Sequence, residues 1–195
     1  MGYVFEIDKA VHVCAYLLSK TQSRTMNYMK LLKLLHFANR ESIRETGAPM
    51  IGDDTYAMEF GPVLTQTCNL IRGVAYQDAK ENLPKWAEYF DTDKGYNISL
   101  KTTPEEFGEL SDYEIDLLDK LFALHEHDDG FKLAELSHDF PEWRRNYVPG
   151  TSTLIPLEDI VEAVGRGQDA GKIAAQRHYD ISIEQVLRQA KVNAG

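Results

Sequence analysis

The sequence contains little cysteine, with only Cys14 and Cys68 among its 195 residues. Both lie in apolar, helix-like surroundings without a metal-binding spacing, so we interpret them as small buried thiols rather than as a disulfide. No apolar run approaches the roughly 20 residues that span a bilayer. Residues 1–8 lack the basic and apolar regions of a secretory signal. We therefore expect a cytoplasmic protein without a membrane partner.

Motifs of the common catalytic sites are missing as well. The sequence has no Gly-rich phosphate loop and no Ser-x-x-Lys, Gly-x-Ser-x-Gly, Cys-x-x-Cys or His-Glu-x-x-His pattern. His125 and His127 suggest a metal site, but helical residues two apart point about 200° apart and cannot share one ion. We interpret them as a polar helix end, and His36 as a core histidine. We expect a protein that is not an enzyme and has no metal or other cofactor.

Basic residues are scarce in one part of the chain. The net charge is −10, and residues 78–129 hold 15 acidic and 5 basic residues, which accounts for all of it. Such a region attracts basic proteins, although it can also be a solvated surface that aids solubility. Basic residues recur in segment 24–44, but the acidic Glu41 lies among them and Glu45 directly follows the last of them. We therefore expect no direct nucleic acid binding.

The most apolar stretch runs from Met26 to Phe37. Its apolar residues occupy most of the circumference of a helix, which predicts a central core helix wrapped by others. Its remaining polar positions, which we expect to form a narrow strip that reaches water, are Lys30, Lys33 and Asn39. Ser23 or Thr25 is the expected cap at its start, and Gly47 its end.

Two segments have the alternating pattern of strands. Residues 55–60 and 96–101 each alternate with a period of two, and we expect them to pair with each other. Gly61 permits a sharp turn after the first, and Pro62 suits the first position of a helix that ends near Gly73.

Helical patterns cover much of the rest. They predict helices at residues 8–20, from Ser111 to about Glu126, at 131–138, after Pro141 and after Pro156. Ser111 and Glu114 form the Ser-x-x-Glu pattern of a capping box, and Ser182 with Gln185 can cap a last helix. Gly130 is the expected stop before residue 131. The predicted fold class is mainly α (α+β): a compact helical domain around a buried central helix, with a small antiparallel β-hairpin or ribbon. We expect the chain to consist of this domain at residues 1–165 and a C-terminal helical extension at residues 166–195.

Several segments, in this order, resemble the Panacea domain, a phage- and plasmid-associated domain found in many antitoxins. They are Asp8–Leu18, Leu31–Ala38, Phe60–Val63, Leu136–His138 with Trp143, and Ile155–Val164. The motif positions, which we expect to be structural, are Lys33, Phe37, Phe60, Gly61, Pro62, Val63, His138 and Trp143. The chain departs from the family at His36 and Phe60, where the family often has Tyr; both replacements retain a ring.

The resemblance implies a non-catalytic antitoxin that binds and blocks its cognate toxin, which we expect to be basic. For the contact we expect the ribbon, the acidic region 78–129, and an apolar face of the tail made of Ile181, Ile183, Val186 and Leu187. The tail can equally dock on its own domain. One alternative is a proteolytic adaptor that delivers the toxin to a protease. Alternatives of other classes are a metal-dependent hydrolase using His125 and His127, with His36 or His138, and an acidic decoy of nucleic acid.

Overall fold

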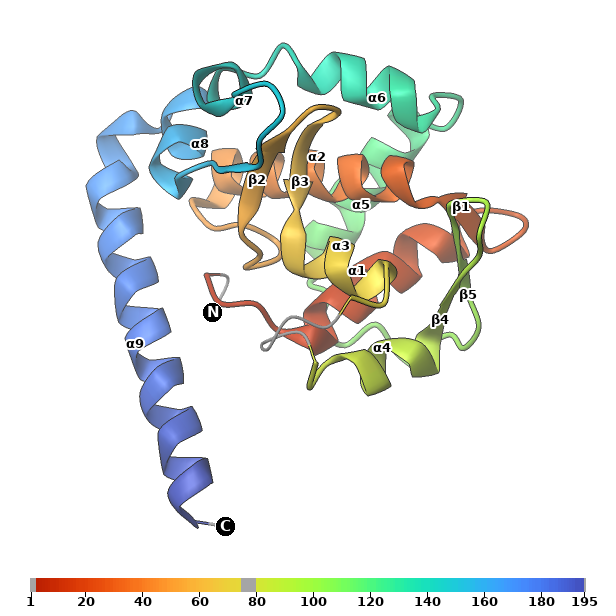
Figure 1. The fold of residues 1–195 in the computed structure, drawn as a ribbon, viewed down its shortest axis with the longest axis horizontal. Helices are drawn as coiled ribbons and strands as arrows, with labels where there is room; N and C mark the ends of the chain where they lie inside the picture. The colour runs from red at the N-terminus through yellow and green to blue at the C-terminus, as the bar shows by residue number, and fades with distance from the viewer. Residues whose placement is uncertain (1–2, 75–79, 195) are drawn as a thin grey trace.

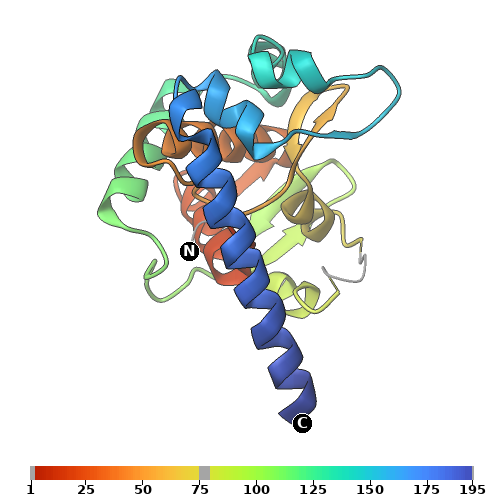
Figure 2. The same cartoon turned by 90° about the vertical axis from the view of Figure 1, so that its left-hand side faces the viewer.

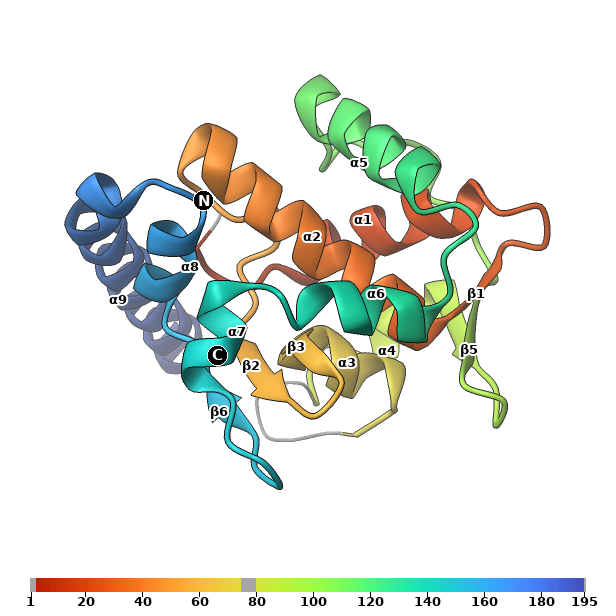
Figure 3. The same ribbon diagram turned by 90° about the horizontal axis from the view of Figure 1, so that it is seen from above.

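A computed structural model describes residues 3–74 and 80–194 of the chain. Helix α2 (Tyr28–Thr46) runs through the middle of the molecule (Figure 1). Residues 31–39 of this helix are all buried. Figure 3 shows why: α6 (Gly130–Ser137) lies along one side of α2, with α1 (Ile7–Ser19) and α5 (Asp112–Leu124) along others. The predicted central core helix is confirmed.

Two details of α2 differ from the prediction. The cap is Asn27, whose side chain accepts hydrogen bonds from the backbone of Met29 and Lys30, and not Ser23 or Thr25. Ser23 and Thr25 lie in or before strand β1 (Thr25–Asn27), which runs directly into the helix. The expected water-facing strip is also wrong, because Lys33 and Asn39 are buried by neighbouring elements that the helix pattern alone does not show.

The strands form two small antiparallel sheets. Strand β2 (Thr55–Met58) pairs with β3 (Gly61–Leu64) on one side and with β6 (Thr153–Leu154) on the other. Strand β5 (Asn97–Leu100) lies between β1 and β4 (Phe90–Thr92). The expected pairing of residues 55–60 with 96–101 is therefore wrong. Gly61 has a φ of +87°, which reverses the chain at once and pairs β2 with the residues that follow it.

Pro62 also takes a different place from the predicted one. It lies in β3, opposite Ala57, and helix α3 (Thr65–Ile71) begins only after that strand. A proline without an N–H is tolerated there because β3 is at the edge of its sheet.

The remaining helices follow the sequence patterns, with three exceptions, of which the first is α4 (Leu83–Tyr89), a helix that was not predicted. Ser111 and Glu114 form the predicted capping box of α5. Gly130 begins α6, with Asp129 as its cap, and does not end the preceding helix. Ser182 lies inside a continuous helix, where its hydroxyl donates to the carbonyl of His178. The other helical elements are α7 (Pro141–Asn146), α8 (Leu157–Ala163), a 3-10 turn (Gly167–Asp169) and α9 (Ala170–Ala194).

Side chains of these elements form two apolar clusters. The larger surrounds α2 and includes the buried faces of α1, α5 and α6. The smaller joins the end of α2 to the β2–β3 hairpin, α7, α8 and the start of α9 through Ile43, Ala57, Trp143, Ile155, Leu157, Ile160, Val161 and Ile173. The predicted fold class, mainly helical with small antiparallel sheets, is confirmed. No helix in the described ranges is long and apolar enough to cross a membrane.

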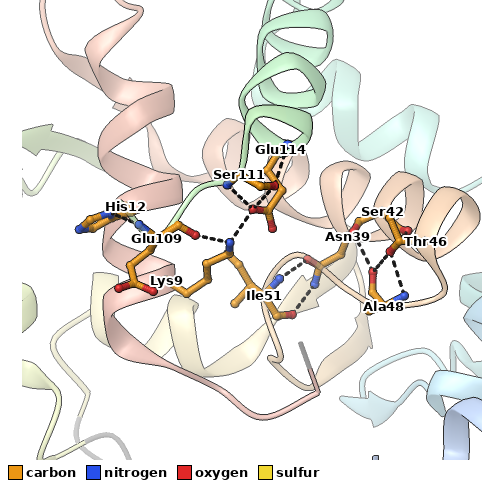
Figure 4. A network of polar contacts seen from close by, with 10 residues as sticks. All are labelled: Lys9, His12, Asn39, Ser42, Thr46, Ala48, Ile51, Glu109, Ser111 and Glu114. Carbon is orange, nitrogen blue, oxygen red and sulfur yellow. Dashed lines mark hydrogen bonds and ion pairs between the residues drawn. The ribbon is translucent and has the colours of Figure 1, made fainter. Parts of the chain in front are cut away.

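Polar contacts fix the loops around α2 (Figure 4). The Asn39 side chain donates to the carbonyl of Ile51 at 2.9 Å and accepts from its N–H at 2.8 Å. The ammonium of Lys9 on α1 contacts Glu114 of α5 at 2.7 Å and the carbonyl of Glu109. These contacts hold the 48–51 loop to α2 and the start of α5 to α1.

Candidate functional site

The motif residues meet where α2, the β2–β3 hairpin and α6 come together. Lys33 is 1% exposed, and its ammonium donates to the carbonyl oxygen of Pro62 at 2.8 Å. Burial lowers the pKa of Lys33 to about 7. A Cβ on Gly61 would overlap the Oγ of Ser137 and lie 2.9 Å from the Lys33 Nζ. Only glycine lets the hairpin approach both helices this closely.

His138 and Trp143 hold the other side of the hairpin. The indole N–H of Trp143 donates to the carbonyl of Met58 at 3.0 Å, and the Nε2 of His138 lies 3.1 Å from the carbonyl oxygen of Glu59. The Trp143 ring stacks between His138, with centroids 4.2 Å apart, and Tyr147, with centroids 4.5 Å apart. Both motif residues therefore fix the hairpin against α7.

The other motif residues divide between the interior and the surface. Phe37 is buried, and its ring meets those of Phe140 and His125 edge to face. Val63 is partly buried against the larger core. Phe60, at the tip of the hairpin, is 49% exposed and is the motif side chain most open to solvent.

A buried charged group beside this junction was missed by the sequence reasoning. Glu142 is fully buried, binds Arg40 through both carboxylate oxygens, and lies 3.7 Å from the Nε2 of His36. Burial alone would raise the pKa of Glu142, but its interactions with His36 and Arg40 outweigh burial and lower it. Glu142 and Arg40 are 102 positions apart, so no fixed spacing could reveal the pair.

His36 is fully buried, and neither ring nitrogen has a hydrogen-bond partner among the described residues. The predicted core position of His36 is therefore confirmed. Desolvation lowers its pKa, which favours the neutral imidazole despite the nearby carboxylate of Glu142.

A cavity next to His36 is lined by charged groups that are already paired. Arg40 binds Glu142, and Arg177 binds Asp54. Asp53 accepts hydrogen bonds from the backbone of Gln66 and from the backbone and hydroxyl of Thr67. Arg40 and Arg177 thus each face a carboxylate, Asp53 is held by neutral hydrogen-bond donors, and His36 lines the same cavity with both ring nitrogens unpartnered among the described residues.

His125 and His127 have different surroundings. His125 caps the end of α5 and its Nδ1 lies 2.8 Å from a carboxylate oxygen of Asp128, whereas His127 is exposed. Within the described ranges no three His, Cys, Asp or Glu side chains are grouped to hold a metal ion. The arrangement is that of a polar helix end.

The tail helix α9 has two different halves (Figure 2). Its first half packs on the domain through Ile173, which is buried, and through an ion pair between Arg177 and Asp54. Its second half extends beyond the body of the domain. The sequence left open whether the tail docks on its own domain or stays free. The first half of α9 is docked, and the second half extends away from the domain.

The four predicted tail residues lie on two faces of α9. Ile181 is partly buried and lines a pocket with Val4 and Phe5 of the N-terminal segment. At about 100° per residue, the other three share a face with a residue that the prediction missed. We define this face as the α9 stripe: Tyr179, Ile183, Val186 and Leu187. Tyr179, Val186 and Leu187 are 61%, 68% and 51% exposed, and Ile183 is partly exposed.

A comparison with protein families gives one match. Residues 31–144 match the family described as "Antitoxin SocA-like, Panacea domain". The matched range begins in α2 and ends in α7, so it contains the hairpin and all of the motif residues around it. Neither the curated proteins nor the solved structures include a match.

Proposed function

Because the chain belongs to the SocA-like Panacea-domain antitoxins, as its sequence resemblance predicted, we propose that it neutralises a cognate toxin by binding it directly. In this proposal the domain around α2 is a rigid scaffold that presents a binding surface. A structural role for the charged side chains around His36 is supported by their pairing, since the buried Glu142 binds Arg40 and Asp54 binds Arg177.

The α9 stripe is the observation that carries this proposal. Its members are spaced as i, i+4, i+7 and i+8, the pattern with which an amphipathic helix lies in an apolar groove of a partner. The face that packs on the domain holds Ile173 and Arg177 and points elsewhere. The domain therefore anchors α9 while the apolar face of its second half stays available to a toxin.

The charge of the chain supports a basic toxin. The described part of the acidic region, residues 80–129, contributes carboxylates along α5 and the β4–β5 ribbon, whereas Asp78 lies outside the described residues. Such a surface would speed the encounter with a basic partner and would do so less at high salt.

Co-expression with the toxin encoded in the neighbouring reading frame tests the proposal. The double variant Val186→Glu with Leu187→Glu places two carboxylates on the stripe without touching the packed half of α9. We expect it to lose the rescue of growth and the co-purification of toxin. Gln189→Glu, an exposed position off the stripe, is the matched control and should retain both.

The outcomes separate the parts of the proposal. A wild-type chain that does not bind the toxin would refute direct neutralisation. Full rescue by the double variant would remove the stripe from the binding surface. Toxin lifetime, measured in the same cells, should be unchanged, because a shortened lifetime would indicate delivery to a protease. A truncation at Gly165 is a poorer test because it also removes the buried Ile173.

A further inference from the structure

A second apolar surface lies far from α9, where the hairpin tip meets the start of α6. Phe60 is 49% exposed and Phe131 is 67% exposed, and their rings meet edge to face with centroids 6.1 Å apart. Tyr28 and Tyr96 form a second edge-to-face pair, with centroids 5.8 Å apart. A groove runs between the two pairs over Met29. Exposed aromatic side chains gathered around a groove mark an interaction site more often than scattered apolar residues do.

The walls of this groove are held in place by the packing of two helix starts. A Cβ on Gly130 would lie 3.0 Å from the backbone nitrogen of Lys30 and from the Cβ of Met29, so the first turn of α6 touches the first turn of α2. Asn27 and Asp129 cap the two helices at this point. The groove is therefore formed by rigid elements before any partner arrives.

The charge around the groove is negative. Asp128 and Asp129 line it, and the exposed Glu126 and Glu59 lie next to lining residues. The carboxylates of Asp128, Glu126 and Asp129 also interact electrostatically with the Lys30 ammonium. The basic lining residue, Lys30, directs its ammonium to the carbonyl oxygens of His125 and Glu126, both at 2.8 Å. An incoming segment thus meets carboxylates around an aromatic floor.

We propose that this groove docks a basic segment of a second protein, which inserts an aromatic or long aliphatic side chain beside Phe60 and Phe131. The apolar rings would bury the inserted side chain, and the surrounding carboxylates would bind flanking Lys or Arg. The first turns of α2 and α6, which line the groove, lie on the opposite side of the molecule from α9 (Figure 1). This separation leaves room for a second protein at the groove while the toxin of the proposed function is bound at the α9 stripe.

An NMR titration of the isotope-labelled full chain tests the proposal. The probe is an amidated peptide, Lys-Arg-Phe-Leu-Arg-Lys, and its control is the same peptide with Glu at each basic position. We expect the basic peptide to shift amide signals of residues 27–30, 59–61 and 127–131, and the acidic peptide to leave them unchanged. Phe131→Ser should raise the Kd about tenfold or more. Val148→Ser, at a 52% exposed residue of another loop, should leave the Kd unchanged.

Three results would overturn the proposal. The first is a set of shifted signals outside the groove, and the second is an equal effect of Phe131→Ser and Val148→Ser. The third is loss of toxin binding in Phe131→Ser, which would make the groove part of the toxin site. Because residue 131 is exposed, both variants should melt at the wild-type temperature, which a thermal scan confirms. Peptide binding by the Val186→Glu, Leu187→Glu variant should remain intact whatever happens to toxin binding.

Discussion

Lys33 on α2 donates its hydrogen bond to the carbonyl oxygen of Pro62, 2.8 Å away, in a part of the core that water barely reaches. An ammonium group has three donors, so a single protein acceptor is a poor substitute for water. This explains why its pKa falls from 10.5 to about 7. The same contact connects the central helix to the hairpin that carries the family motif.

The Lys33 amine should make stability depend on pH above neutrality. Between pH 7 and 10.5 the unfolded chain holds a proton that the folded chain has released, so the free energy of unfolding rises with pH in this window. The slope is at most about 1.4 kcal/mol per pH unit. Urea denaturation at about pH 7.5 and 9.5 should show this rise, and the Lys33→Met variant should lack it. Parallel changes in the two proteins would argue that the amine stays charged.

Gly61→Ala should destabilise the fold more than a matched substitution elsewhere. Gly150 has a positive φ of +75° and open space around it, whereas Gly61 has a φ of +87° and faces Ser137 and Lys33. The variants share a backbone strain of about 1 kcal/mol, and only Gly61→Ala adds a steric overlap. We expect Gly61→Ala to lose roughly 2 kcal/mol more than Gly150→Ala in chemical denaturation. Equal losses would show that the hairpin can move away from α6.

Glu142→Gln should weaken the fold through the group that sequence reasoning missed. The carboxylate is fully buried against Arg40 and His36, so removing its charge leaves Arg40 poorly compensated. We expect a loss of roughly 3 kcal/mol. Glu162→Gln is the control, because Glu162 pairs with Arg145 at the surface and should cost less than about 1 kcal/mol. Similar melting curves for the two variants would contradict a structural role for Glu142.

The two halves of α9 should respond differently to truncated side chains. Ile173 is 6% exposed and belongs to the smaller core, so Ile173→Ala should cost roughly 3 kcal/mol. Val186→Ala, in the α9 stripe, should change stability by less than about 0.5 kcal/mol in the isolated chain. Thermal and urea unfolding measure both. A large cost at Val186 would mean that the stripe already packs on this protein and is not free for a toxin.

Local patterns identified most of the helices, although not α4, and they did not identify the partners of the strands. The burial of α2 and the capping box of α5 could be predicted because they depend on neighbouring residues in sequence. The choice between pairing β2 with β3 or with β5 depends on the conformation of Gly61 and on contacts that form only in the folded domain. A period of two shows that a strand exists, but it does not say which strand lies beside it.

The candidate site was predictable only in part for the same reason. Lys33 was assigned to a water-facing strip because lysine is usually exposed, and only the hairpin and α6 reveal that water is excluded. Three of the four predicted tail residues belong to the α9 stripe, whereas Ile181 is on the face of α9 that is turned toward the domain. Tyr179 was missed because the last helix was expected to begin near Ser182, whereas α9 begins at Ala170.

The two strands that pair with β2 lie at very different distances from it in the sequence. Strand β3 follows β2 directly, whereas β6 consists of Thr153 and Leu154. During translation, β2 emerges from the ribosome long before β6 and carries an unpaired edge in the meantime. Unpaired edges of nascent chains invite pairing with other chains. Binding of chaperones to the nascent chain, and its misassembly with other chains, should therefore be greatest while the residues between β2 and β6 are being synthesised. Both should fall once β6 has emerged.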